Sequence, residues 1–331
     1  MCYFLRCFSR KFNTFDINPE QPPASSSPTR AFDGMRSPEF DDFLDGMDAR
    51  YLYWDEIKYR KDPPFGNDAQ AAWALVKANR RRHYKTVALG RYVFNYYLTS
   101  QLQKELHEFD LKLLGRLHLS RATEGDDKEY PERSLIEEAI ASSQIEGAAT
   151  TTRVARDMLK SKRKPRNESE RMIFNDLRAI RFITDSVHAP IDKAMVVELH
   201  RIMTADTPAG DCAGDYRKDK IYVSDHADGE IAHIPPDWDE VEQLMEALYA
   251  FADKEKEFIH PIAKASMIHF FIGFIHPFKD GNGRTARALF YWYLLKKEYA
   301  LVKNISISRV ILESRVQYDK AFLKTEMTKT T

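Results

Sequence analysis

The sequence has few cysteines, and their arrangement excludes two classes of protein. Cys2, Cys7 and Cys212 are its three cysteines, and none of them forms a C-x-x-C pair. Disulfide-stapled scaffolds and zinc knuckles depend on an even or closely clustered set. Neither class is therefore supported, and a reducing compartment is expected.

Long apolar runs are also missing. A helix that spans a membrane needs about 18 or more apolar residues, and the nearest candidate, residues 267–278, is shorter and contains two histidines. At the N-terminus, Arg6, Arg10 and Lys11 interrupt the apolar start before a signal core can form. We therefore predict a cytoplasmic protein that does not span a membrane.

Neither sign of charge is in excess. Fifty Lys and Arg residues balance fifty Asp and Glu residues, and 43% of the chain is apolar. A protein that coats nucleic acid or an anionic membrane needs a basic surplus or a one-sided basic patch. Neither kind of partner is expected, and the basic cluster over residues 77–85 is interpreted as a solvated helix end.

Patterning along the chain predicts a mainly α-helical protein in three parts. Residues 1–46 are rich in Pro, Ser and acidic residues and lack a sustained period, which is typical of a disordered extension. Residues 47–130 read as an N-terminal helical region, with helices over 69–82, capped by Asp68, and over 92–117. Residues 131–331 form the core, beginning with a helix over 131–147 that Gly147 is placed to end.

One interval of the core has β-type alternation. Residues 220–224 and 231–234 flank a turn that contains Asp228 and Gly229, which predicts a β-hairpin over about 220–235. A lone hairpin is not stable by itself, so it either packs on the helices as a connector or receives another strand. The hairpin residues in question are Ile221, Tyr222, Val223, Ile231, His233 and Ile234.

Two apolar helices, predicted over 262–275 and 285–295, meet at a polar loop, residues 276–287. Gly281, Asn282 and Gly283 can present consecutive N–H groups to an anion at a helix N-terminus. Arg284 and Arg287 are three residues apart, share one helix face and suit a bound phosphate.

The same loop holds a candidate metal ligand and a candidate base. Asp280 would repel phosphate unless Mg²⁺ sat between them. His276 lies at the end of a buried helix, where a neutral imidazole can accept a proton from an attacking hydroxyl. Together these residue types favour phosphoryl or nucleotidyl transfer.

Residues 276–287 resemble the signature H-x-F-x-D/E-G-N-G-R-x-x-R of the Fic family, with every defining position present. The resemblance implies a protein adenylyltransferase that moves AMP from ATP to a Ser, Thr or Tyr hydroxyl of a target protein. It implies His276 as the base, Asp280 as the Mg²⁺ ligand, and Gly281, Asn282, Gly283, Arg284 and Arg287 as the nucleotide site. It also implies that the hairpin is a flap that aligns the target by strand addition.

A second resemblance concerns control. Residues 142–147 are similar to the inhibitory pattern S/T-x-x-x-E-G/N, with Ser142, Glu146 and Gly147 at its defined positions. The family uses this glutamate to pair with the second arginine, here Arg287. Two alternatives stay open: a de-AMPylase that uses the same pocket, and a catalytically silent protein that binds nucleotide. The sequence also leaves open a homo-oligomer and the identity of the target.

Overall fold

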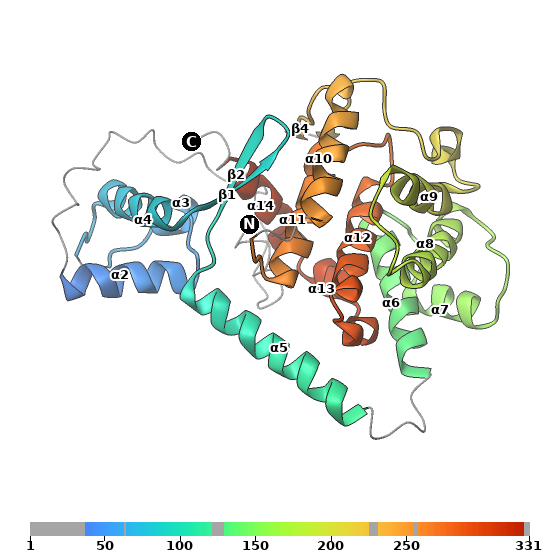
Figure 1. Cartoon of the computed structure of the whole chain (residues 1–331), viewed down its shortest axis with the longest axis horizontal. Coiled ribbons are helices and arrows are strands. Elements are labelled where there is room, and N and C mark those ends of the chain that lie inside the picture. The colour runs from blue at the N-terminus through green and yellow to red at the C-terminus, as the bar shows by residue number, and fades with distance from the viewer. Residues whose placement is uncertain (1–36, 63, 121–128, 225–230, 254–256, 328–331) are drawn as a thin grey trace. The chain divides into compact units, whose positions relative to one another are not determined.

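The computed structural model describes residues 37–62, 64–120, 129–224, 231–253 and 257–327 (Figure 1). These residues fall into two compact units. The smaller unit comprises residues 37–109 and 319–327, and the larger unit comprises residues 110–318. Residues 1–36 of the predicted extension therefore lie outside the described residues.

The smaller unit combines helices with one antiparallel hairpin. Its elements are α2 (Pro38–Ala49), α3 (Trp54–Ile57), α4 (Ala69–His83), β1 (Lys85–Leu89), β2 (Tyr92–Tyr96) and the first half of α5 (Ser100–Ser120). Its core gathers buried side chains of α2, α3 and α4, with Trp73 in edge contact with Tyr53. Asp68 caps α4 by accepting a hydrogen bond from Ala71 N, as predicted.

Three sequence predictions for this unit need correction. Residues 38–46, predicted to belong to a disordered extension, form most of helix α2. Phe43 and Met47 are buried at helical spacing, and the acidic composition of the segment obscured this pattern. Residues 92–96 form β2, not the start of a helix, because Gly90 turns the chain at φ +57° and alternate residues of both strands are buried. Arg80, in the supposedly solvated basic cluster, is buried and donates to Asp48 at 2.8 Å.

The larger unit is built around α11 and α12. Its elements are α6 (Glu129–Ile145), α7 (Thr152–Lys160), α8 (Glu168–Asp185), α9 (Lys193–Thr204), η1 (Pro208–Cys212), β3 (Val223–Ser224), β4 (Ile231–His233), η2 (Trp238–Glu240), α10 (Val241–Asp253), α11 (Pro261–Ile275), α12 (Asn282–Lys296), η3 (Ala300–Asn304), α13 (Ile307–Glu313) and the start of α14 (Arg315–Met327).

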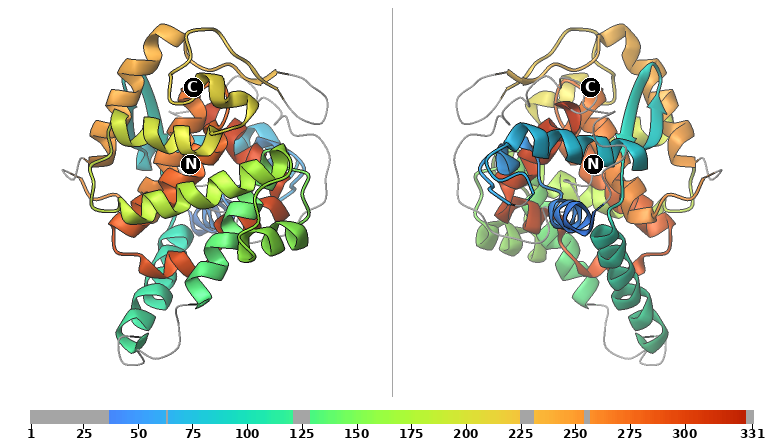
Figure 2. Two further views of the ribbon diagram at one scale, coloured as in Figure 1. Left: turned by 90° about the vertical axis from the view of Figure 1, so that its right-hand side faces the viewer. Right: turned by 90° about the vertical axis from the view of Figure 1, so that its left-hand side faces the viewer.

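Helices α11 and α12 are apolar on nearly every face, as the sequence predicts, and they are buried against each other. Helices α8 and α9 lie side by side, and both pack on α12 (Figure 2). Helix α6 packs between α8 and α13. The loop between α11 and α12 therefore joins two buried helices, which fixes the position of the candidate site.

The predicted hairpin is present as β3 and β4, which pair antiparallel with Val223 opposite His233. Its strands are shorter than predicted, and Ile221, Tyr222 and Ile234 flank them. Residues 225–230, which contain the predicted turn, lie outside the described residues.

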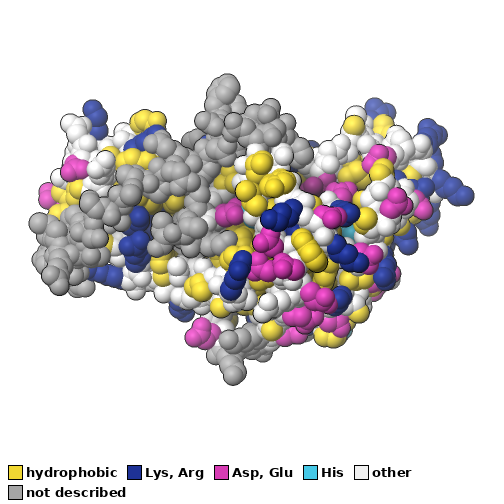
Figure 3. Space-filling model, turned by 90° about the horizontal axis from the view of Figure 1, so that it is seen from above, with side chains coloured by type: hydrophobic (Ala, Val, Ile, Leu, Met, Phe, Trp, Pro, Cys, Tyr) yellow, Lys and Arg dark blue, Asp and Glu magenta, His cyan; other side chains and the backbone are white. Residues whose placement is uncertain are grey.

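Within the described residues, no helix is both long and apolar enough to cross a membrane. The face drawn in Figure 3 carries acidic and basic side chains interspersed among its coloured residues, with apolar side chains between them. The presence of both signs of charge on this face agrees with the balanced charge of the sequence.

Candidate functional site

His276 lies at the point where α11 ends. Its backbone is left-handed, at φ +50°, and its N–H still donates to Ile272 O, so the chain turns sharply out of the helix. The ring Nδ1 lies 3.3 Å from Gly273 O, and we assign the ring proton to this hydrogen bond. The neutral ring then has Nε2 as its proton acceptor. Burial lowers the pKa of His276 to about 4, so the ring is neutral at pH 7.

The loop after His276 is held in place by Asn282. Its side chain accepts from Phe278 N at 2.9 Å and donates to Phe278 O at 2.8 Å. Asn282 therefore fixes the loop, and only its backbone faces the predicted phosphate site. Phe278 is fully buried and anchors the loop in the core.

His200 supports the other side of the loop and was not predicted from the sequence. Its ring stacks on Phe278 with centroids 3.7 Å apart. Nε2 lies 2.9 Å from Asp280 O, and Nδ1 accepts from Gly214 N, which sets the tautomer with the proton on Nε2. His200 lies on α9, 80 positions from Asp280 along the chain, so no local sequence pattern links the two residues.

Arg217 is a second residue that the sequence did not identify. It is 2% exposed, and its guanidinium donates to His276 O at 2.9 Å and to Ile275 O at 3.3 Å. It also donates to Pro236 O, directly after the flap. One buried cation thus satisfies the carbonyl end of α11 and joins it to the flap.

The glycine-rich turn opens α12, but its glycines differ in conformation. Gly281 is left-handed, at φ +79°, whereas Gly283 lies inside the first turn of the helix. Of Gly281, Asn282 and Gly283, only Gly281 is therefore left-handed, because α12 already begins at Asn282. The anion site that remains is the helix N-terminus itself, whose first N–H groups lack partners within the helix.

The two arginines of α12 are both buried, and each has a different set of partners. Arg287 donates from Nε to Ser142 Oγ and from Nη2 to Ser142 O, both at 3.0 Å, and its Nη1 lies 3.0 Å from Glu146 Oε1. Arg284 donates to Met203 O at 3.0 Å. Its guanidinium lies between Asp176 and Asp280, each 3.7 Å away.

Glu146 follows the last residue of α6. Gly147 is left-handed, at φ +94°, and Ala148 N donates to Ser143 O, so the helix ends in a glycine cap, as predicted. Burial alone would raise the pKa of Glu146, but Arg287, with Arg284 and Arg315, lowers it, so the carboxylate is ionised. Ser142 accepts a hydrogen bond from Arg287, so it helps to hold the arginine that pairs with Glu146.

Asp280 is the candidate metal ligand. Its side chain is 61% exposed, and its Oδ1 accepts from Gly281 N at 2.7 Å. No group of three or more His, Cys, Asp or Glu side chains suited to a metal occurs within the described ranges. Mg²⁺ commonly binds one or two carboxylates, waters and substrate phosphates, so one exposed carboxylate beside an anion site fits Mg²⁺ held jointly with a nucleotide.

The flap presents its apolar residues to solvent. Tyr222, Ile231 and Ile234 are 57%, 54% and 63% exposed, whereas Ile221 and Val223 are half-buried. His233 is held against the core, because its Nε2 lies 2.9 Å from the backbone oxygen of Phe274, two residues before His276. The flap is thereby placed beside the end of α11.

Comparisons with known proteins agree with this geometry. The Fic/DOC family model matches residues 190–294. A protein named Protein adenylyltransferase Fic from Nematostella vectensis is 36% identical over 102 residues, which are 30% of this chain and 22% of that protein. The protein of the same name from Drosophila erecta is 28% identical over 206 residues, which are 60% of this chain and 39% of that protein. The chain thus spans less than half of the length of these curated relatives.

Two solved structures share the fold. A Fic family protein from Desulfovibrio desulfuricans has a TM-score of 0.54 at 19% identity, with 70% of this chain and 74% of that chain covered. A fragment of Fic-1 from C. elegans has a TM-score of 0.51 at 18% identity, with 88% and 86% covered. The helical unit that brings His276 and the two arginines of α12 together is therefore a Fic fold, and residues 190–294 within it match the Fic/DOC family model.

Proposed function

We propose that this protein transfers AMP from ATP to a hydroxyl of a target protein, and that Glu146 restrains the reaction. The observation that carries the proposal is the Glu146–Arg287 ion pair, 3.0 Å long, at the N-terminus of α12. A carboxylate there occupies a position that suits a nucleotide phosphate. The names of the curated relatives support the same reaction.

Each residue of the site has a separate role in the proposed reaction. The target hydroxyl attacks the α-phosphorus of ATP, its proton passes to His276 Nε2, and the bond to the β-phosphate breaks, which releases pyrophosphate. The N-terminus of α12, Arg284 and Arg287 hold the phosphates. Asp280 would hold Mg²⁺, which neutralises phosphate charge when bound.

Burial lowers the pKa of His276, whereas the neighbouring Glu146 carboxylate raises it. A base with a pKa of about 4 accepts protons poorly at pH 7. Bound phosphates would add negative charge beside the ring and raise its pKa towards neutrality. Nucleotide binding would therefore both supply the substrate and activate the base.

The test is transfer of label from α-³²P ATP to protein. We expect the Glu146→Gly protein to label itself or a target in lysate, and the Glu146→Gly, His276→Ala protein to show no label. Label that persists without His276 would exclude it as the base. Mass spectrometry of the labelled protein should show a 5′-adenylyl adduct on a Ser, Thr or Tyr side chain.

A second candidate activity is removal of AMP from a modified target. It is favoured by the proximity of Glu146 to His276, which is close enough for the carboxylate to raise the pKa of the ring. In that reaction Glu146 would orient a water. The Glu146→Gly change should then abolish AMP release from an adenylylated substrate and leave nucleotide binding intact, the opposite of its effect on transfer.

A further inference from the structure

Arg284 is one of the two buried arginines of α12. It is 1% exposed, and Nη1 donates a hydrogen bond to Met203 O. Within the described part of the chain, its buried Nε has no hydrogen-bond partner. A buried guanidinium in this state is positioned mainly by the carboxylates that surround it.

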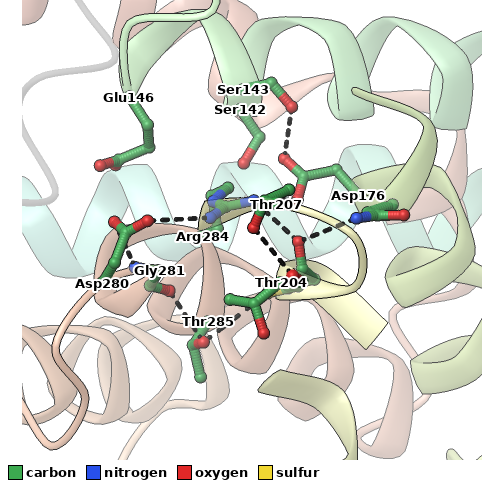
Figure 4. A network of polar contacts seen from close by, with 12 residues as sticks. Ser142, Ser143, Glu146, Asp176, Thr204, Thr207, Asp280, Gly281, Arg284 and Thr285 are labelled. Carbon is green, nitrogen blue, oxygen red and sulfur yellow. Dashed lines mark hydrogen bonds and ion pairs between the residues drawn. The ribbon is translucent and has the colours of Figure 1, made fainter. Parts of the chain in front are cut away.

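Two carboxylates compete for this guanidinium. Asp176 and Asp280 are each 3.7 Å from it, on different nitrogens, which is too long for a hydrogen bond (Figure 4). Asp176 is 2% exposed, whereas the Asp280 side chain is 61% exposed. Attraction across a medium of dielectric about 20 is about fourfold stronger than in water, so Asp176 dominates the position of Arg284.

Asp176 is in turn bonded to α6. Ser143 Oγ donates to Asp176 Oδ2 at 2.7 Å, and Ser143 adjoins Ser142, which bonds Arg287 (Figure 4). The last turn of α6 therefore contacts Arg287 directly and Arg284 through Asp176. The buried Oδ1 of Asp176, which has no hydrogen-bond partner among the described residues, is the oxygen nearest to Arg284.

We propose that Asp176 is a positioning residue for Arg284: it draws the guanidinium away from Asp280, so that Asp280 remains available to a divalent cation. The hydrogen bond from Ser143 makes this arrangement depend on the position of α6. The inference rests on the proposed function for its nucleotide and metal, and it assigns to Asp176 and Ser143 a role that the sequence motifs do not include.

The consequence is a specific change in Mg²⁺ dependence. Without the Asp176 charge, and with Glu146 also removed, Arg284 would turn to Asp280 and compete with Mg²⁺ for its carboxylate. ATP binding in the presence of Mg²⁺ would then require more Mg²⁺. ATP binding without Mg²⁺ would not weaken, because the phosphate site would have gained net positive charge.

The experiment is calorimetric titration of ATP into the Glu146→Gly protein at a series of Mg²⁺ concentrations and without Mg²⁺. We expect Asp176→Asn to raise the Mg²⁺ concentration for half-maximal binding by about tenfold. Ser143→Ala, which keeps both charges, should raise it by about threefold. Asp185→Asn, the same change at an exposed position of α8, should leave it unchanged.

The outcomes separate this inference from the proposed function. A loss of ATP affinity that is equal with and without Mg²⁺ would mean a merely structural role and would overturn the inference. If Asp176→Asn does not fold, the Ser143→Ala protein decides, and an unchanged Mg²⁺ dependence there overturns the inference. Failure of the Glu146→Gly protein to bind ATP would instead overturn the proposed function and this inference with it. Binding without AMP transfer would contradict the transfer reaction alone.

Discussion

The carboxylate of Glu146 fills the space that a side chain at Gly283 would occupy. A Cβ built at position 283 would lie 2.2 Å from Glu146 Oε1 and 3.1 Å from Arg287 Nη1. Gly283 has a helical backbone that any residue could adopt. Its lack of a side chain is therefore needed for the close approach of the Glu146 carboxylate. The Glu146–Arg287 contact, which we propose to be inhibitory, therefore depends on Gly283 as well as on the glutamate.

Gly283→Ala should release the restraint without a change to Glu146. The methyl group would displace the carboxylate from Arg287, and we expect transfer of AMP to rise by about tenfold, the factor that corresponds to 1.4 kcal/mol. The measurement is label from α-³²P ATP on protein. In the Glu146→Gly background the same change should have no effect; a fall there would show that the methyl group obstructs the nucleotide.

Arg315→Met should also raise basal transfer. Arg315 Nη1 donates to Ile145 O at 2.6 Å, where α6 ends and Glu146 begins. Loss of a charge-assisted bond of about 1.5 kcal/mol or more would loosen this end of the helix, and we expect a rise of about threefold to tenfold in the initial rate of labelling. Arg309→Met, at an exposed arginine paired with Glu313 on α13, is the matched control and should not change the rate.

Arg217→Lys should lower both stability and turnover. Lysine cannot reach His276 O, Ile275 O and Pro236 O at once. We expect a loss of about 2 kcal/mol in the free energy of unfolding by urea and a lower kcat in the Glu146→Gly background. Lys218→Ala, at the exposed neighbouring residue, should leave both values unchanged. Unaltered stability of the Arg217→Lys protein would show that the hydrogen bonds of Arg217 to the end of α11 and to Pro236 do not stabilise the fold.

His276 should make stability depend on pH. Its pKa is about 4 in the folded protein and about 6.5 when unfolded. Between these values the unfolded state binds more protons, so stability falls as the pH is lowered from about 6.5 to 4. We expect His276→Gln to remove about 2 kcal/mol of this fall, measured by urea unfolding across that range. The pKa of buried His269 is also lowered, but it contributes equally to both proteins.

The sequence predicted the parts of the fold that depend on local patterning. The apolar runs of α11 and α12, the cap at Asp68 and the glycine that ends α6 follow from spacing and side-chain type, and all three are present. The hairpin β1–β2 was missed because the apolar residues of its second strand also match helical spacing into α5. Helix α2 was missed because its acidic composition resembles a disordered segment.

The sequence alone specifies the groups that we propose to carry the chemistry, because His276, Asp280, Arg284 and Arg287 lie within twelve consecutive positions of a short motif. The surroundings of these groups depend on tertiary packing. Arg217, His200 and Asp176 reach the site from three distant segments, and they act through hydrogen bonds and ion pairs that have no periodicity along the chain. The electrostatic state of the site, with a neutral His276 and an ionised Glu146, depends on burial and on charges brought together by packing, and so it exists only in the folded chain.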